Sequence, residues 1–443
     1  MSAWLTVVAK GEPLEFSVVE GLRTVKLDLV LSLALAAVVL FVGYFVQRRV
    51  GVLARANIPA AAVGGLLFAG AVFALRASGV LGVSLNTTLR APLQTAFFTT
   101  IGLGATLGLL RAGGWRMGFF WLIATLAAVV QNVVGMALAV ALGAPTLLGV
   151  ICGALTLTGG PATGQAWEAR FTELGIEGAG SLIIASALFG IFVSSLVGNP
   201  IATALIRRFR LARERERGVD STEEEKFRAL SPTVAPADDE DEGRGVEREE
   251  AGLDASVLLR NLLLVLLVMG AGAVLSLLIR HPSFTLPDYI GAMVVAAVVR
   301  NVDERTGWFR VDTRAVGAIA TVSLALFLVI ALMSLELWKI AGLALPMLVI
   351  LCAQVLVTVA YAVFVTFVLM GRDYEAAVTA GGHIGFGLGI TANAVANMET
   401  LVERYAPAPR SFLVVPVVGA FFIDFSNALV IGLFINLYAN FAR

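Results

Sequence analysis

The sequence predicts an all-α polytopic membrane protein, built as two inverted repeats of about five transmembrane helices, each with a re-entrant hairpin. Of its 443 residues, 58% are hydrophobic and 14% charged, whereas a soluble domain is about half apolar. Apolar runs long enough to cross a bilayer, which takes about 20 residues, recur from Leu27 to Tyr438. Two further segments, rich in Gly, Thr and Asn, occupy matching places in the two halves of the chain.

The apolar runs divide into two sets of five, which define two membrane repeats at residues 27–206 and 254–443. The first set falls near 28–46, 59–77, 92–110, 116–142 and 180–206. The second falls near 254–279, 286–300, 314–335, 341–369 and 411–438. Residues 1–26 form an N-terminal segment, whose first apolar stretch is too short for a signal peptide and lacks its basic start. Both cysteines lie in apolar runs, so neither a disulfide framework nor a zinc site is expected.

A charged linker, residues 207–253, separates the repeats and contains RRFRLARERERG and the acidic run DDEDEG. Such a composition cannot bury enough apolar surface to fold alone. Its arginines directly follow an apolar run, which places the linker in the cytoplasm by the positive-inside rule. Counting spans from there puts the N-terminus outside, despite Lys10, Arg23 and Lys26. The first hairpin then enters from outside and the second from the cytoplasm.

The first predicted hairpin lies near residues 145–168 and contains Thr158, Gly159, Gly160 and Thr163. The two glycines allow a sharp turn, and Pro161 suits the first turn of the returning half-helix. The free N–H groups and positive dipole end of that half-helix favour an anion. We therefore predict these four residues, with their two hydroxyls, as substrate-binding.

The second predicted hairpin lies near residues 375–399 and carries five glycines within nine residues. Each glycine costs about 1 kcal/mol in a plain helix, so close helix packing or an unwound turn that faces a substrate must compensate. Neighbouring Thr and Asn residues favour the turn. The predicted substrate-binding residues are Gly385, Phe386, Gly387, Thr391 and Asn393. A lone histidine here, His383, is interpreted as structural, with a proton-carrying role as the alternative.

The two hairpins follow a glutamine at the same distance. Gln131 precedes Gly159 by 28 positions and Gln354 precedes Gly382 by 28, and each glycine is expected to begin its glycine-rich turn. With five spans in each half, the repeats must be inverted in the membrane. Inverted repeats with broken helices are typical of alternating-access transporters, whose sites lie at the midplane. Self-similar composition of membrane helices is the alternative explanation.

Asp424 is an acidic residue within a predicted span, where ionisable side chains are rare and usually functional. Asn427, three positions later, shares its helix face, and the two offer hard oxygen ligands that suit a hard cation. We predict Asp424, Asn427, Gln131 and Asn397 as candidate sodium ligands, with sodium as coupling ion and no other cofactor. The alternatives are an interfacial Asp424, one paired with a neighbouring helix, and a Gln131 that only joins helices.

Several stretches resemble the bacterial sodium/glutamate symporters, over nearly all of the chain from Leu27 except the linker. They are IPAAAVGGLL at 58–67, TAFFTTIGLGATLGLLRAGG at 95–114, LTGGPATGQAW at 157–167, GGHIGFGLGITANAVANM at 381–398 and FLVVPVVGAFFIDFSNALVI at 412–431. The resemblance implies a homodimeric carrier in the bacterial cytoplasmic (inner) membrane that imports L-glutamate with sodium by alternating access. Two departures lie in the hairpins: Pro161-Ala162 replaces a common His-Gly, and Ala392-Asn393 replaces the Pro-Thr of a frequent Thr-Pro-Thr.

Other classes of function fit the sequence less well. The alternative within transport is a sodium- or proton-coupled carrier of another small carboxylate or amino acid. An enzyme would show paired ionisable residues at membrane depth, whereas only Asp424 and His383 are found, so we predict no catalytic residues. No P-loop suggests a primary pump, a channel would need a continuous polar pore, and nothing indicates a nucleic-acid partner.

Overall fold

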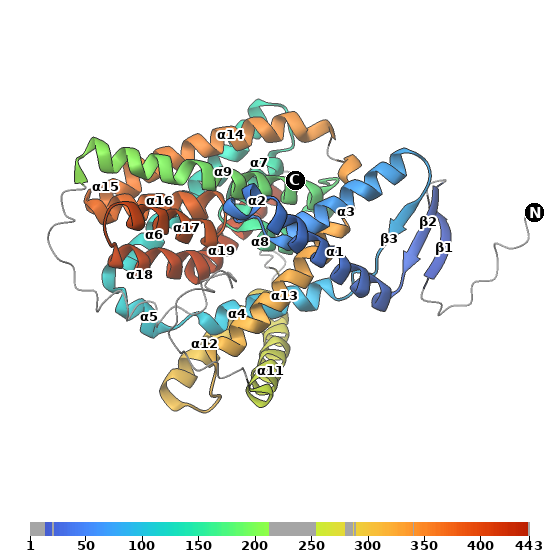
Figure 1. Cartoon of the computed structure of the whole chain (residues 1–443), viewed down its shortest axis with the longest axis horizontal. Coiled ribbons are helices and arrows are strands. Elements are labelled where there is room, and N and C mark those ends of the chain that lie inside the picture. The colour runs from blue at the N-terminus through green and yellow to red at the C-terminus, as the bar shows by residue number, and fades with distance from the viewer. Residues whose placement is uncertain are drawn as a thin grey trace, which may run out of the picture.

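The chain forms a bundle of helices with one small sheet at its N-terminal end (Figure 1). The computed structural model describes residues 14–19, 22–211, 254–279, 287, 289–339 and 341–441. Most of the predicted charged linker, residues 212–253, lies outside the described residues, as does the apolar stretch at the N-terminus.

The first half of the chain contributes these helices: α1 (Leu29–Arg49), α2 (Gly51–Arg55), α3 (Ala60–Ala77), α4 (Arg90–Gly104), α5 (Leu107–Ala112), α6 (Gly114–Ala141), α7 (Thr146–Val150), the π-helical η1 (Ile151–Leu155), α8 (Gly160–Glu173) and α9 (Ala179–Arg208). The second half contributes α11 (Ala255–Ile279), α12 (Tyr289–Thr306), α13 (Thr313–Met333), the short η3 (Leu337–Lys339) and η4 (Ala341–Leu343), α14 (Ala344–Tyr361), η5 (Ala362–Thr366), α15 (Phe367–Leu369), α16 (Tyr374–Leu388), α17 (Thr391–Arg404), α18 (Pro409–Val417), η6 (Val418–Phe422) and α19 (Ile423–Phe441).

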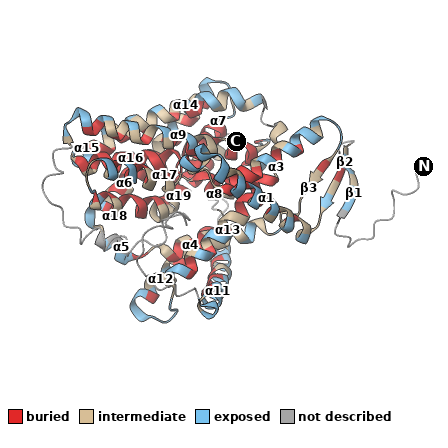
Figure 2. Cartoon of the chain, viewed as in Figure 1, coloured by how far each residue is buried: buried red, intermediate tan, exposed pale blue. Residues whose placement is uncertain are grey.

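Eight of these helical segments are long and apolar enough to cross a membrane. The two predicted spans outside that set are α4, which has 15 residues, and α12, whose last turns carry charges. Apolar side chains cover outer faces of the bundle, where Phe41, Leu278 and Leu356 are more than 70% exposed (Figure 2). Because such faces suit lipid rather than water, the predicted all-α membrane class is confirmed.

The helices form two bodies that lie side by side (Figure 1). The panel consists of α1, α3, α4, α11, α12 and α13, whose buried side chains form two apolar clusters. The hairpin body consists of α6 to α9 and α14 to α19, and holds the largest cluster. Small residues let the helices of each body approach closely. Both hairpins are packed within the hairpin body, so their broken backbone does not face lipid.

The panel shows one pattern of helix neighbours twice. Helix α1 packs on α3 and α11 packs on α12, while α3 packs on α13 and α12 on α4. Glycines lie at a close approach in each of the two outer helix pairs: Gly43 lies near Gly64, and Gly272 near Gly291. The two halves of the chain thus build the panel in corresponding ways.

A three-stranded sheet, which was not predicted, is formed by two strands before α1 and one strand after α3. Strand β1 (Leu14–Val19) pairs antiparallel with β2 (Leu22–Leu27), and β2 pairs in parallel with β3 (Gly82–Ser84), which follows α3. Strands of three to six residues that carry charges leave little hydropathy signal in a membrane protein. The sheet ties the N-terminal segment to the loop between α3 and α4.

Each half contains a broken hairpin, hairpin 1 (α7, η1 and α8) and hairpin 2 (α16 and α17). In hairpin 1 the backbone leaves helical geometry at Gly153 and adopts a left-handed conformation at Gly160, with φ of +67°. In hairpin 2 the break falls at Gly389, whose φ of −137° and ψ of −119° end α16.

The expected turn at Gly382 to Gly387 was therefore wrong, because these residues lie inside α16. The break follows Gln354 by 35 positions, not 28. The glycines instead let α16 pack closely: a Cβ on Gly385 would lie 2.4 Å from the Cα of Ala394 in α17. This is the close-packing alternative for a glycine-rich helix.

Candidate functional site

Gln131, in the middle of α6, bonds to both hairpins. Its side-chain oxygen accepts a hydrogen bond from Thr158 of hairpin 1 at 2.7 Å. Its side-chain nitrogen donates to the carbonyl oxygen of Gly387 in hairpin 2 at 2.7 Å and to Thr358 of α14 at 3.0 Å. All four residues are buried, so each hydrogen bond satisfies polar groups that water does not reach. The structure thus brings together three predicted site residues, and Thr358 joins them.

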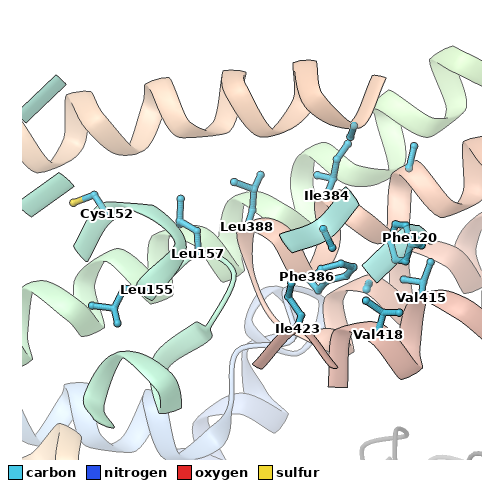
Figure 3. Packing of buried hydrophobic residues seen from close by; sticks show 14 of the residues in the cluster. Phe120, Cys152, Leu155, Leu157, Ile384, Phe386, Leu388, Val415, Val418 and Ile423 are labelled. Atoms are coloured by element: carbon cyan, nitrogen blue, oxygen red, sulfur yellow. The ribbon is translucent and has the colours of Figure 1, made fainter. Parts of the chain in front are cut away.

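The ends of the two hairpins meet beside Gln131. A Cβ on Gly160 would lie 3.2 Å from the side chain of Ile390, which follows the break in hairpin 2. Leu157 and Leu388 lie near one another in the core and both approach Gly190 of α9 (Figure 3). The first turns of α8 and α17 therefore begin next to each other, and both begin within the hairpin body.

Two asparagines hold the first hairpin at Ala154, next to its distorted residue Gly153. Asn132 of α6 accepts from the Ala154 N–H at 3.0 Å, and Asn427 of α19 donates to the Ala154 carbonyl at 2.8 Å. Among the described residues, the side-chain oxygen of Asn427 has no hydrogen-bond partner, and neither does that of Gln354. Gln354 bonds through its nitrogen to the Gln131 carbonyl at 2.6 Å. Buried oxygens without a donor are suited to a cation.

The two predicted asparagines of hairpin 2 face a different neighbour. Asn393 donates to Ser195 at 2.5 Å and to the Ile191 carbonyl at 3.1 Å, both on α9. Asn397 donates to the Ser194 carbonyl at 3.3 Å. Within the described residues, no hydrogen bond joins either asparagine to Asp424 or Asn427. They therefore dock α17 on α9, although the side-chain oxygen of Asn393 stays unpaired.

Asp424 is the second residue of α19, which directly follows the π-helical η6, and it is partly buried. Among the described residues, none donates a hydrogen bond to its carboxylate. Asn427 lies on the same helix but bonds to Ala154. The carboxylate of Asp424 and the amide oxygen of Asn427, three positions apart on one helix, are hard ligands that suit a monovalent cation.

The remaining predicted residues are placed by packing. Thr163 and Phe386 are buried, at 2% and 1% exposure, and Phe386 stacks on His383 with ring centres 5.2 Å apart. Nδ1 of His383 bonds to Thr366 of η5 at 2.7 Å. Thr391 begins α17 and lies close to Gly419 of η6. Among the described residues, no group of three His, Cys, Asp or Glu side chains could hold a transition metal.

One cation near the hairpins was not singled out in the sequence. Arg90, at the start of α4, bonds to Glu168 and to the side chain of Gln165, both on α8. It therefore ties the panel to hairpin 1. Its position at the edge of an apolar run was the available signal, but its partners come from a segment 75 and 78 residues away.

Comparisons with known proteins agree with this architecture. A family model described as sodium/glutamate symporter matches residues 25–407. The sodium/glutamate symporter of Escherichia coli (strain K12) is 38% identical over 414 residues, covering 93% of this chain and 98% of that protein. The sodium/glutamate symporter of Haemophilus influenzae is 35% identical over 398 residues, covering 90% and 94%.

Among solved structures, a sodium proton antiporter from Methanocaldococcus jannaschii aligns with 93% of this chain and 98% of its own. The identity is 12% and the TM-score 0.40, a likeness too weak to carry a structural argument. The family model spans most of the chain, and the two relatives align along nearly their whole length. The chain therefore belongs to the sodium/glutamate symporter family.

Proposed function

We propose that the chain is a secondary active transporter that imports L-glutamate with sodium by alternating access. The observation that carries this proposal is the position of Gln131, which bonds to the broken ends of both hairpins in the interior of the hairpin body. Broken helices that meet at depth are the arrangement in which carriers bind ions and small solutes. The solute and the ion are taken from the names of the two relatives, which are sodium/glutamate symporters.

The solute would bind where the hairpin ends meet. The positive ends of the α8 and α17 helix dipoles lie there, and they favour a carboxylate. The residues proposed to line this place are Thr158, Gly159, Gly160, Thr163, Gly385, Phe386, Gly387, Thr391 and Asn393. Gly385 and Phe386 contribute by packing, since both lie within α16.

Sodium would bind close by, through oxygen ligands. Asp424 contributes a carboxylate without a donor, and Asn427 contributes a buried amide oxygen without one. Gln131 and Asn397 are the other proposed ligands. The negative charge of Asp424 attracts sodium, and the bound sodium compensates for the carboxylate of the solute. Sodium and solute therefore bind together more tightly than either binds alone.

Alternating access would require the panel and the hairpin body to move relative to one another. The repeated helix neighbours of the panel and the hairpin of each half support two inverted repeats. We further propose the bacterial cytoplasmic membrane as location, with the linker of residues 207–253 on the cytoplasmic side. A homodimer is proposed from the family resemblance, and mass measurement of the solubilised protein tests it.

Uptake of radiolabelled L-glutamate into proteoliposomes that contain the purified protein tests the proposal. An inward sodium gradient is expected to drive accumulation above equilibrium, whereas potassium or proton gradients of equal size are not. Folded protein that accumulates no glutamate under the sodium gradient would contradict the proposal. Competition by other small carboxylates would then identify the solute, since Pro161-Ala162 departs from the family pattern at the hairpin.

A further inference from the structure

We propose that Arg90 and Glu168 form a gate between the panel and hairpin 1, and that this gate must open in each transport cycle. Arg90 begins α4 in the panel, and Glu168 lies in α8 of hairpin 1. The inference rests on the proposed function, because alternating access requires the two bodies to move relative to one another. It adds to that function the contact that has to break before they can move.

Arg90 reaches across the interface to two residues of α8. Its guanidinium forms a salt bridge with the Glu168 carboxylate. It also donates to the side-chain oxygen of Gln165 at 2.5 Å and to the Gln165 carbonyl at 3.4 Å. Gln165 and Glu168 lie three positions apart on α8, so they share one face of that helix. Hydrogen bonds between charged groups are about twice as strong as neutral ones, so the gate holds α8 firmly against the start of α4.

The two acceptors of Arg90 are fixed in turn by α9. Nε2 of Gln165 donates to the Gly180 carbonyl at 3.0 Å, and Glu168 lies so close to Gly180 that no Cβ would fit there. The next residue, Ser181, accepts a hydrogen bond of 3.1 Å from the backbone N–H of Glu336, which follows α13 of the panel. The panel therefore bonds to α8 and α9 at one place, and separation of the bodies would break these bonds together.

The panel and the hairpin body also bond to each other further along α9. The Ala56 carbonyl, between α1 and α3, accepts from Ser195 of α9 and from Asn393 of hairpin 2, both at 3.2 Å. Ser181 and Ser195 are 14 positions apart on α9, which is about 21 Å along a helix. Between them, Ile184 packs in an apolar cluster of the panel. The interface thus has polar contacts at two levels and an apolar part between them.

The contacts at the two levels differ in strength. The bonds to the Ala56 carbonyl are neutral, whereas the gate joins an arginine to a carboxylate. A hydrogen bond is lost once donor and acceptor are more than about 3.5 Å apart, so a movement that exposes the interface near hairpin 1 must break the gate. Arg90 and Glu168 therefore determine how often the interface opens at that level.

The first experiment measures this opening with a thiol reagent, on the purified full chain without glutamate. The reporter is Ala162→Cys in a Cys352→Ser background, because Ala162 of α8 is 9% exposed and packs in an apolar cluster of the panel. Glu168→Gln removes the charge at nearly constant volume. It is expected to raise the labelling rate at position 162 about two- to fivefold, the effect of losing a partly exposed ion pair. Arg90→Gln should raise the rate to a similar extent.

Glu173→Gln is the matched control for this experiment. Glu173 forms its ion pair with Arg170 of the same helix, at 3.0 Å, so this pair does not join the two bodies. The variant should leave the labelling rate at position 162 unchanged. Cys152, which is 0% exposed within hairpin 1, remains in every variant and reports unfolding. Its own labelling should stay negligible throughout.

The second experiment tests whether the gate must open for transport. Arg90→Cys and Glu168→Cys are combined in the Cys352→Ser background and joined by a short, reducible thiol cross-linker. Uptake of L-glutamate into proteoliposomes under a sodium gradient should stop on cross-linking and return when a reductant is added. Each single-cysteine variant, treated in the same way, should keep most of its uptake.

The outcomes separate the gate from the function on which it rests. Cross-linked protein that takes up glutamate as fast as the reduced protein would overturn the gate alone. Equal labelling of position 162 in Glu168→Gln and Glu173→Gln would also overturn it, as would an equal rise at Cys152, which would show unfolding. Wild-type protein that takes up no glutamate, together with faster labelling in Glu168→Gln, would contradict the proposed solute and support the gate, since labelling needs no glutamate.

Discussion

Gln131 donates a hydrogen bond of 2.7 Å to the carbonyl oxygen of Gly387. This bond joins an unbroken helix to the last turn before the break in hairpin 2. Since the same side chain accepts from Thr158 at 2.7 Å, one residue holds the ends of both hairpins. The arrangement of the site therefore depends on a single amide that is 2% exposed.

Replacing Gln131 by Leu should reduce both stability and transport. Three bonds would be lost, to Thr158, Gly387 and Thr358. Hydrogen bonds between membrane helices contribute about 0.6 kcal/mol on average and up to about 1.7 kcal/mol, so a loss of roughly 2 kcal/mol is expected. Thermal unfolding in detergent and glutamate uptake measure the two effects. The control is Gln47→Leu, which loses one bond of 3.1 Å to Ile58 in the panel. Equal behaviour of the two variants would contradict the bridging role.

Replacing Asp424 by Asn should abolish the stimulation of uptake by sodium while leaving most protein folded. The change removes the charge at nearly constant volume, and no described residue donates a hydrogen bond to the carboxylate that would be lost. Uptake measured against sodium concentration is the test. Asp312→Asn is the control, since Asp312 caps α13 by accepting from Ala315 at 2.9 Å, a position that Asn fills equally well. Unchanged sodium dependence in Asp424→Asn would remove Asp424 from the cation site.

Replacing Gly160 by Ala should impair transport more than folding. Gly160 has φ of +67°, a left-handed conformation that costs a residue with a Cβ roughly 1–2 kcal/mol, and the added Cβ would press on Ile390 at 3.2 Å. Gly118→Ala in α6 is the control, because no atom lies within 4 Å of its Cβ position, and Ala favours the helix. Uptake rates that are the same in both variants would show that the hairpin does not need this close approach.

Asp303, in the last turns of α12 and beyond the predicted span, should make stability depend on acid pH. Burial alone would raise its pKa, but the backbone N–H groups of Val311, Phe309 and Arg310 and the charge of Arg300 lower the pKa below 3.8. Its three hydrogen bonds are 2.7 to 2.9 Å long.

Because the folded-state pKa is lowered, the stabilisation by Asp303 is fully present above pH 3.8 and is lost as the pH falls through the folded value. The free energy of unfolding of Asp303→Asn should therefore lie below that of the wild type near neutral pH. The difference should shrink in acid. A difference that does not shrink as the pH falls from about 5 to about 2, through and below the ordinary aspartate pKa of about 3.9, would contradict this account.

The sequence predicted the membrane class, because the thickness of a bilayer requires long apolar runs. It also predicted that both hairpins exist, because segments rich in Gly, Thr and Asn are unfavourable in lipid. It could not place the break of hairpin 2. Gly385 and Gly389 look alike in the sequence, yet Gly385 packs against Ala394 in α17 and only Gly389 leaves helical geometry. Which glycine turns depends on the opposing helix, which the sequence does not reveal.

The residue types of the candidate site were predicted from the sequence, but the contacts between these residues were predicted only in part. Thr158 and Gln131 were both singled out, but their hydrogen bond joins positions 27 residues apart and depends on how α6 crosses the hairpin. Asn397 was predicted as a sodium ligand, and the bond of its side-chain nitrogen to α9 could not be foreseen from the sequence.

The most direct test of the account is a measurement of reciprocal coupling. Proteoliposomes that contain the purified protein would be given an inward glutamate gradient, with equal sodium on both sides and the membrane potential clamped. The account predicts that labelled sodium then accumulates inside, that Asp424→Asn abolishes this accumulation, and that Asp312→Asn does not. Glutamate that enters without net movement of sodium would contradict it.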